Sequence, residues 1–499
     1  MRYETVPTEI TLSDIESKEA SWSPSMYRHV TLPTSATKRV EELLEVDRPY
    51  DKGVEPGSVW YMRRSSYNFI RTKAIQEYSC LIYPKGDAII PINGRVFEGS
   101  GLLDKDILMI KDSNVGECVI IIGHNWQNYM FSAGIVRLHP IINPYYLFSF
   151  LKHPLFKLQL LALIARDTTI THARDLWLNC YIPFPNQENS DLVIKYVSVL
   201  MEAIVQKEVA IRERNSSIDR AFELELGTNQ QLDKTFFFSM PTIKEIQELG
   251  RLDTGMYSVD YKDKLFRIIN YKYGYTNYVE LGFDVIRGQN LQISNIGESI
   301  YSDVYKSDFY RLVAPTDISE YRTVRQFRYL GSSKKLSLLK QGDVIFGAEG
   351  FGKGRVVILA DEAQNTISNI HGIIFHPQDE NIIKGIFLGC FLGYLRAIGL
   401  VDAIAAGGSG GSLAISYFHH VPFPKFPEDK QREIAQLYHN PALPPTDTPT
   451  IDTFLDWHSL WNKELGIWEL DREMKALQQT LADVQDRIIE GKRVDVPLN

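Results

Sequence analysis

Cysteine is scarce in this chain, and its spacing does not suit a metal site. Four cysteines occur among 499 residues, without a CxxC pair and without histidines at the spacing of zinc ligands. This absence excludes the common structural zinc motifs and predicts reduced, buried thiols in a cytoplasmic protein. The four expected thiols are Cys80, Cys118, Cys180 and Cys390.

Long apolar runs are missing as well. The longest run, at 385–395, is about half of the ~20 residues that a membrane-spanning helix needs, and Lys384 and Arg396 flank it. Residues 1–17 are polar and acidic, unlike the apolar core of a secretory signal. We therefore expect neither a membrane segment nor a signal peptide.

No complete catalytic motif is present, although the glycine-rich string GAEGFGK at 347–353 resembles one. It fits the phosphate-binding pattern GxxxxGK, but Gly354 follows where that motif needs Ser or Thr to hold magnesium. The string also lies between two strand-like runs and does not open a helix, as phosphate binding would require. It predicts a β-hairpin whose glycines allow another backbone to approach closely.

Two shorter strings are also incomplete. Asn143-Pro-Tyr-Tyr resembles the Asn-Pro-Pro-Tyr/Phe site of adenine methyltransferases, but the second proline and a glycine-rich cofactor loop are missing, so it predicts a helix start. Glu16-Ser-Lys lacks the upstream Pro-Asp pair of a nuclease site. We therefore expect no catalytic residue, no cofactor and no bound metal, and instead a protein that recognises a partner.

What the chain does contain is an internal repeat. Five segments of the first half recur in the same order in the second half, with the last three at offsets of 237–239 residues. The matched segments begin at Thr11 and Thr242, Phe69 and Val285, Asp106 and Asp343, Gly134 and Gly372, and Tyr181 and His420. Length alone suggests about three domains, but the repeat predicts two similar ones.

Each copy has the pattern of an α+β domain. Short runs rich in Val and Ile, such as 106–110 and 343–347, predict strands, and the apolar stretches 145–165 and 382–404 predict buried helices. An apolar heptad stripe from Val193 to Ile218, with Lys207 and Arg214 at polar positions, predicts a coiled-coil helix of about 26 residues. A second stripe, from Leu470 to Ile488, predicts another.

These patterns predict two tandem globular domains, each followed by a long helix. The expected segments are a first domain at 1–187, a spacer helix at 188–228, a second domain at 229–426, a helix start at 427–440, a proline-rich linker at 441–450 and a C-terminal coiled-coil helix at 451–492.

Charge is unevenly placed along the chain. The total is −8, from 54 basic and 62 acidic residues, which by itself argues against a polyanion partner. However, residues 62–96 hold six basic residues against two acidic ones, and residues 320–360 hold eight against three, whereas residues 441–499 hold six against eleven. One basic patch therefore falls in each copy.

The basic patches mix side chains that suit DNA. Arginine recognises guanine through paired hydrogen bonds, Asn and Gln recognise adenine, and Lys holds phosphates. The predicted DNA contacts are Arg63, Arg64, Asn68, Arg71, Lys73, Arg287, Gln289, Asn290, Arg322, Arg325, Arg328 and Lys353.

Taken together, the chain resembles the specificity subunit of a type I restriction-modification enzyme. The resemblance covers most of the chain and rests on the order and duplication of its segments: FIRTK and VIRGQN, the two D-[IV]-[LI] runs, and GGSGGSLAISYFHHVPFPKFPEDKQREIAQL with the helix that follows. It implies two target-recognition domains, each bound to half of a bipartite site in double-stranded DNA, and spacer helices that dock methyltransferase subunits, with a restriction or translocase subunit as a further candidate. The proline-rich break and Trp457, Trp461 and Trp468 depart from the family pattern and leave the pairing of the last helix open.

Two other classes of function remain as alternatives. One is a stand-alone DNA methyltransferase or nuclease, whose activity would depend on Asn143 or Glu16. The other is a coiled-coil scaffold that does not bind nucleic acid.

Overall fold

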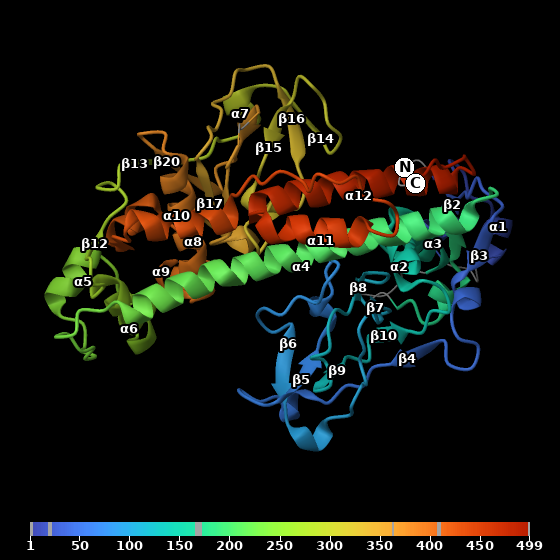
Figure 1. Cartoon of the computed structure of the whole chain (residues 1–499), viewed down its shortest axis with the longest axis horizontal. Coiled ribbons are helices and arrows are strands. Elements are labelled where there is room, and N and C mark those ends of the chain that lie inside the picture. The colour runs from blue at the N-terminus through green and yellow to red at the C-terminus, as the bar shows by residue number, and fades with distance from the viewer. Residues whose placement is uncertain (1–2, 18–21, 165–171, 362–363, 407–410, 498–499) are drawn as a thin grey trace. The chain divides into compact units, whose positions relative to one another are not determined.

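The chain builds the same four-stranded antiparallel sheet twice. The computed structural model describes residues 3–17, 22–164, 172–361, 364–406 and 411–497 (Figure 1). Residues 1–208, 444–461 and 473–499 form one compact unit, and residues 209–443 and 462–472 form a second. Both units contain helices and strands, so the predicted α+β class is confirmed.

The main sheets of the two units have matching strand orders and antiparallel pairing throughout. In the first unit the order is β4 (Tyr50–Lys52), β10 (Ile135–Leu138), β7 (Ile107–Ile110) and β8 (Cys118–Ile120). In the second unit it is β13 (Phe283–Arg287), β20 (Gly372–Pro377), β17 (Val344–Gly347) and β18 (Val356–Ile358). The inner strands β7 and β17 are buried on both faces, which explains why their sequences lack polar side chains.

Each unit also has a second sheet with one antiparallel and one parallel pairing. In the first unit β5 (Tyr67–Ile70) pairs antiparallel with β6 (Ile89–Ile92) and parallel with β9 (Tyr129–Phe131). In the second unit β15 (Tyr310–Leu312) pairs antiparallel with β16 (Arg328–Ser332) and parallel with β19 (Thr366–Ile367), and β14 (Ser299–Ser302) extends the sheet beside β16.

Strand pairing corrects one of the matched segments. Phe69 lies on β5 of a second sheet, whereas Val285 lies on β13 at the edge of a main sheet. The counterpart of β5 is β15, and the counterpart of β13 is β4. The predicted match of Phe69 with Val285 is therefore wrong, because a short apolar segment does not specify which strand it will pair with. The match of Asp106 with Asp343 is confirmed, since each precedes the central strand β7 or β17.

In each unit, one glycine lies where two backbone segments come into close contact. Gly53 follows β4, and a Cβ atom on it would lie 2.2 Å from the carbonyl oxygen of Ser132. Gly288 follows β13, and a Cβ atom on it would lie 2.1 Å from the carbonyl oxygen of Asn369. In each unit the main sheet thus meets the end of the parallel strand at a point where only glycine fits.

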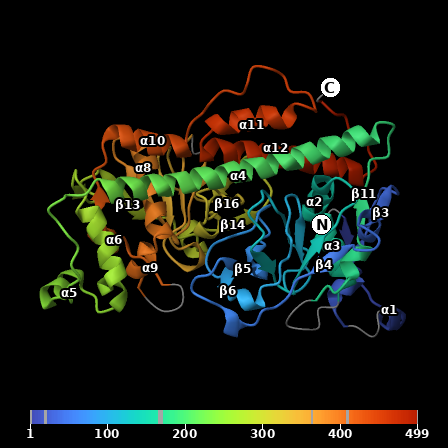
Figure 2. The ribbon, with the colours of Figure 1, turned by 60° about the horizontal axis from the view of Figure 1, so that its bottom comes forward.

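The apolar stretches form helices, but each is broken once. The stretch at 145–165 contains α2 (Pro144–Lys152) and α3 (Pro154–Leu163), separated where Pro154 cannot continue a helix. The stretch at 382–404 contains α8 (Ile382–Ala397) and α9 (Leu400–Ile404), separated at Gly399, whose φ is +77°. Helix α8 packs on β17, β18 and β20 and beside α10 (Glu428–Tyr438) (Figure 2).

The first spacer helix is longer than predicted. Helix α4 (Ser190–Thr228) has 39 residues in place of about 26. All six apolar stripe residues are buried, which confirms the stripe: Val193, Val197, Leu200, Ile204, Ile211 and Ile218. The polar role expected of Lys207 is wrong, because its side chain is fully buried with the ammonium 5.2 Å from the ring centre of Trp461, and burial lowers its pKa to about 8.

The expected single helix at 451–492 consists of two helices, α11 (Phe454–Glu464) and α12 (Ile467–Ile489). The chain turns at Gly466, where a Cβ atom would lie 2.6 Å from the carbonyl oxygen of Tyr438. Side chains from other elements bind the carbonyl groups at the C-terminal end of α11. Asn440 Nδ2 donates to the carbonyl oxygen of Glu464 at 2.5 Å, and Arg214 Nε donates to that of Leu465 at 3.2 Å.

Two other expectations for the fold are confirmed, the hairpin at the glycine-rich string and the buried thiols. The GAEGFGK string forms the loop of the β17–β18 hairpin. All four cysteines are buried, free thiols. None of the helices in the described part of the chain is long and apolar enough to cross a membrane. The remaining helices are α1 (Leu12–Ser17), α5 (Ile243–Leu249), α6 (Val259–Ile269) and α7 (Ile293–Ile296).

Within the described residues, three further pairs of short strands form two-stranded sheets. They are β1 (Glu4–Thr5) with β2 (His29–Val30), β3 (Thr37–Arg39) with β11 (Tyr181–Pro183), and β12 (Tyr275–Thr276) with β21 (Phe423–Pro424). The last two pairs include prolines of the strings Pro183-Phe-Pro185 and Pro422-Phe-Pro424, which lie at the ends of the two copies.

Candidate nucleic-acid interface

The first basic patch surrounds the second sheet of the first unit. Arg63 and Arg64 lie in the bend before β5 and are exposed. Neither side chain has a hydrogen bond or ion pair within the described residues. Exposed cations without carboxylate partners keep their full charge for an anionic ligand, so these two residues are well placed for phosphate contacts.

Arg71 and Lys73 share one carboxylate at the end of the same sheet. Arg71 Nη1 lies 2.8 Å from Asp87 Oδ2, and Lys73 Nζ lies 2.6 Å from Asp87 Oδ1. The hydrogen bond from Lys73 is the main reason why the pKa of Asp87 lies below its usual value. The cluster is exposed and keeps one net positive charge. Asn68 is tied only weakly, with Nδ2 3.4 Å from the carbonyl oxygen of Ser66.

In the second unit, two predicted contacts are occupied by backbone groups. Arg287 Nη2 donates to the carbonyl oxygen of Leu413 at 2.5 Å. The Gln289 amide makes a pair of bonds with Ser337: Nε2 donates to its carbonyl oxygen at 2.7 Å, and Oε1 accepts from its N–H at 3.1 Å. The Gln289 side chain therefore joins two loops and does not present a free edge to adenine.

Arg322 is a correction to the predicted interface. Its side chain is only 4% exposed and lies in the interior of the second unit. It donates to Asn215, to Asp219 at 2.7 Å, and to the carbonyl oxygen of Cys390 at 3.2 Å. Arg322 is therefore excluded from the DNA contacts, because a buried cation with these partners stabilises the fold around α4 and α8 and cannot reach a ligand.

Lys353 is also largely enclosed. Its ammonium lies 3.0 Å from Asp402 Oδ1, and its side chain is 17% exposed. Its charge is thus balanced within the second unit, which makes it a weak candidate for a DNA contact.

Arg328 has a different environment, because its side chain is partly exposed whereas that of its ion-pair partner, Asp317, is buried. Its Nη2 atom lies 2.9 Å from Oδ1 of Asp317; Arg328 is 43% exposed and Asp317 is 3% exposed. Burial raises the pKa of the Asp317 carboxyl, while Arg328, and to a lesser extent Arg325, oppose that effect. Arg325 lies in the same loop, and its N–H donates to the carbonyl oxygen of Asp317 at 2.7 Å.

A cleft of about 420 Å³ opens beside Arg328. Its polar lining includes Asn290, which was predicted, and Tyr301, Asn369 and His371, which were not. These residues come from β14, from the loop before β20 and from the segment before α7. The only sequence signal for them was their residue type, because they are scattered over more than 80 residues.

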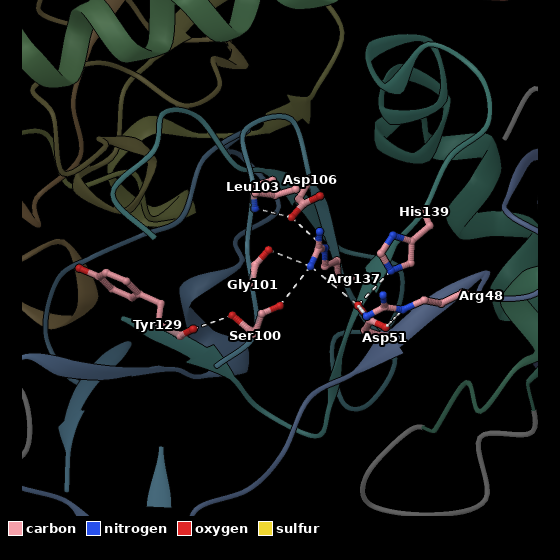
Figure 3. Close-up of polar contacts among 9 residues, drawn as sticks. All are labelled: Arg48, Asp51, Ser100, Gly101, Leu103, Asp106, Tyr129, Arg137 and His139. Atoms are coloured by element: carbon pink, nitrogen blue, oxygen red, sulfur yellow. Dashed lines mark hydrogen bonds and ion pairs between the residues drawn. The ribbon is translucent and has the colours of Figure 1, made fainter. Parts of the chain in front are cut away.

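A group of charges in the first unit has a structural role (Figure 3). Arg137 is buried on β10, with Nε 2.8 Å from Asp106 Oδ2 and Nη1 donating to the carbonyl oxygens of Ser100 and Gly101 at 3.1 and 3.0 Å. Asp51 accepts from Arg48 at 2.7 Å and lies 2.9 Å from His139 Nε2. These contacts join β4 and β10 to the loop at 100–106, and each cation of the group is paired with a carboxylate.

The residues of the enzymatic alternative do not assemble a site. Asn143 is the N-cap of α2, where Oδ1 accepts from the N–H of Tyr145 at 2.9 Å, which confirms the predicted helix start. Glu16 lies exposed on the short helix α1. Across the described ranges, no three His, Cys, Asp or Glu side chains gather where they could hold a metal ion.

Comparisons with known proteins give structural neighbours only. No protein-family model matches the chain, and no curated protein matches it. Three solved structures align with nearly the whole chain. The type I restriction-modification S subunit from M. genitalium has 13% identity and a TM-score of 0.41, with 94% of this chain and 99% of that chain covered. A chain from a study of complex assembly in the type I R-M system has 14% identity, a TM-score of 0.29 and 93% and 100% coverage. The HsdS subunit from Thermoanaerobacter tengcongensis has 15% identity, a TM-score of 0.27 and 92% and 97% coverage.

Proposed function

We propose that the chain is a sequence-specific DNA-binding subunit of a type I restriction-modification complex, in which each unit contacts one half of a bipartite double-stranded target. The observation that carries this proposal is the duplication of the four-stranded main sheet, together with a second sheet in which three strands pair in the same way in both units. Two copies of one fold suit a target with two half-sites, as dimeric DNA-binding proteins suit paired half-sites. The sequence resemblance described above supports the same role.

Equivalent positions of the two units carry different charges. The third residue of the 3-10 helix after β5, η4 (Thr72–Ala74), is Ala74, whereas the third residue of the one after β15, η8 (Pro315–Asp317), is Asp317. In the first unit the carboxylate is instead Asp87, between Arg71 and Lys73. A shared backbone with exchanged side chains supports half-sites of different sequence.

The proposed contacts of the first unit are Arg63, Arg64, Asn68, Arg71 and Lys73. Those of the second unit are Asn290, Arg325 and Arg328, with Arg287, Gln289 and Lys353 acting by holding the surrounding loops. Methyltransferase subunits would dock on this chain and transfer the methyl group, and a restriction subunit, where one joins, would cleave.

Binding of the full chain to random duplex DNA at several salt concentrations tests the proposal. The chain should be assayed alone and with a type I methyltransferase subunit from the same organism. We expect log K to fall linearly with log salt concentration, because bound phosphates release counterions. We also expect methylation only when the partner is present. A chain that binds no duplex in either form, or that methylates or cleaves alone, contradicts the proposal.

A further inference from the structure

The cleft beside Arg328 has the chemistry of a site for one base edge. Its lining combines the polar residues Asn290, Tyr301, Arg328, Asn369 and His371 with apolar residues, among them the buried Leu312. We propose that this cleft recognises a guanine of the target, with Arg328 as the specificity-determining contact and Asp317 as the residue that positions it. The inference deepens the proposed function, on which it rests, by naming the base that one part of the second unit contacts.

The first argument is the way in which Arg328 is held. One guanidinium nitrogen, Nη2, is bound to Asp317, whose carboxylate is buried and whose own N–H donates to the carbonyl oxygen of Ala314 at 2.8 Å. The Nε and Nη1 atoms of Arg328 have no hydrogen-bond partner within the part of the chain that the structure describes. Nη2 carries two N–H groups, so its bond to Asp317 restricts the orientation of the planar group and leaves the second Nη2 N–H for a ligand. Together with the N–H of Nε or Nη1 beside it, that group can form the pair of bonds that recognition of guanine O6 and N7 needs.

The second argument is that the nearby amides are also oriented as donors. Asn290 Oδ1 accepts from the N–H of Gln292 at 3.1 Å, and Asn369 Oδ1 accepts from the N–H of His371 at 3.2 Å. These bonds fix the orientation of both amides and leave their Nδ2 groups as donors. Together with Arg328, the two Nδ2 groups suit a ligand edge made of acceptors. Guanine presents two adjacent acceptors in the major groove, whereas the amino groups of adenine and cytosine are donors.

The third argument separates a base from a phosphate. Phosphate contacts need cations on an open surface, as Arg63 and Arg64 provide, and gain nothing from an apolar lining. This cleft combines Leu291, Leu312 and Ala314 with Tyr301, which is 56% exposed. An apolar and aromatic lining suits the edge and face of a flat base.

The test compares Arg328→Lys, which keeps the charge and loses the planar fork, with the unchanged chain. Both are measured on a random duplex and on the duplex that the unchanged chain selects, and each guanine of the selected duplex is replaced in turn by 7-deazaguanine. We expect Arg328→Lys to weaken binding to the selected duplex by about 10- to 100-fold and to change random-duplex binding by less than about 3-fold. One deaza substitution should weaken binding of the unchanged chain and have no effect on the variant.

Asp317→Asn tests the positioning role with nearly unchanged volume. It should lose discrimination at the same guanine while its random-duplex affinity and thermal midpoint stay close to those of the unchanged chain. Lys335→Gln is the matched control, because Lys335 is an exposed cation just after β16; it should not change discrimination at any single guanine.

Three results overturn the inference in distinguishable ways. If Arg328→Lys lowers the affinity for both duplexes equally and every guanine is still recognised, Arg328 contacts a phosphate. Unchanged selective binding by Arg328→Lys removes Arg328 from the interface and leaves the proposed function intact. Failure of the unchanged chain to bind any duplex rejects the proposed function itself.

Discussion

The Nη2 atom of Arg328 lies 2.9 Å from Oδ1 of Asp317, and the two residues belong to different elements, β16 and the 3-10 helix η8. Since the carboxylate is buried and the guanidinium is half exposed, the fold holds a surface cation in one orientation. The first unit has Ala74 at the position of Asp317, so this pair distinguishes the two copies.

Removing Arg63 and Arg64 together tests the electrostatic part of DNA binding. The double variant Arg63→Gln/Arg64→Gln should bind random and selected duplexes more weakly by similar factors, and its salt slope should fall by up to about 2, one for each phosphate that is no longer neutralised. Its free energy of unfolding should stay within about 0.5 kcal/mol, because both side chains are exposed. Arg493→Gln, an exposed arginine of the acidic tail, serves as the control. An unchanged salt slope would place the DNA elsewhere.

Arg322 should be needed for stability and not for DNA recognition. Arg322→Met leaves the partly buried Asp219 without its partner and removes the bonds to Asn215 and to the carbonyl oxygen of Cys390, so it should destabilise the protein by about 2 to 4 kcal/mol in urea unfolding. Asp219→Leu in the same background should recover part of the loss, since the unpaired charge is then gone. A variant Arg322→Met with normal stability and weak DNA binding would restore Arg322 to the interface.

Gly53 and Gly288 should respond alike to substitution. Gly53→Ala and Gly288→Ala each bring a Cβ atom to 2.1–2.2 Å from a carbonyl oxygen, so both should lower the thermal midpoint clearly. Gly227→Ala is the control in α4, where nothing lies within 4 Å of the added atom, and should be neutral or stabilising by up to about 1 kcal/mol. A strong effect at one of the two sheet glycines alone would argue against their equivalence.

Acid should destabilise the first unit through His153. Burial lowers the pKa of His153 to about 4, from about 6.5 in an unfolded chain. Because the folded state resists protonation, the stability that this group contributes is present above pH 6.5 and is lost as the pH falls toward 4. From pH 7 to pH 5 the loss is about 1 to 2 kcal/mol.

The matched variant is His153→Asn. His153 caps α3 by accepting from the N–H of Leu155, and Asn can make the same cap without a titrating ring. The variant should lose less stability between pH 7 and pH 5 than the unchanged chain in urea unfolding. Parallel pH profiles of the two proteins would show that His153 is not the responsible group.

Patterns of apolar residues predicted much of the fold. The stripe of α4 and the hairpin at 344–358 depend on local periodicity and on turn residues, so they could be recognised from the sequence. The break at Pro154 is also visible in the sequence, since proline cannot continue a helix, but the expected helix at 145–165 runs through it.

Pairing and burial of single residues could not be predicted in this way. The match of Phe69 with Val285 is wrong because the sequence of a short strand does not determine which other strand it pairs with. The sequence around Arg322 does not distinguish it from Arg325, and only the packing of the folded chain shows that Arg322 is buried. Its guanidinium lies against Gly393 of α8, where a Cβ atom would come to 2.5 Å from Arg322 Nε, so the absence of a side chain at Gly393 makes room for it. The cleft residues likewise come together only through sheet register.

The most direct test of the central claim is selection of duplexes from a random pool by the full chain with the proposed methyltransferase partner, followed by the same selection with Arg328→Lys. For the unchanged chain, the account predicts two short conserved blocks of sequence separated by a spacer of fixed length and variable sequence. For Arg328→Lys, it predicts that the preference for guanine is lost at one position of one block and that the other block is selected as before. A single block, no enriched sequence, or changes in both blocks on substitution of Arg328 would contradict it.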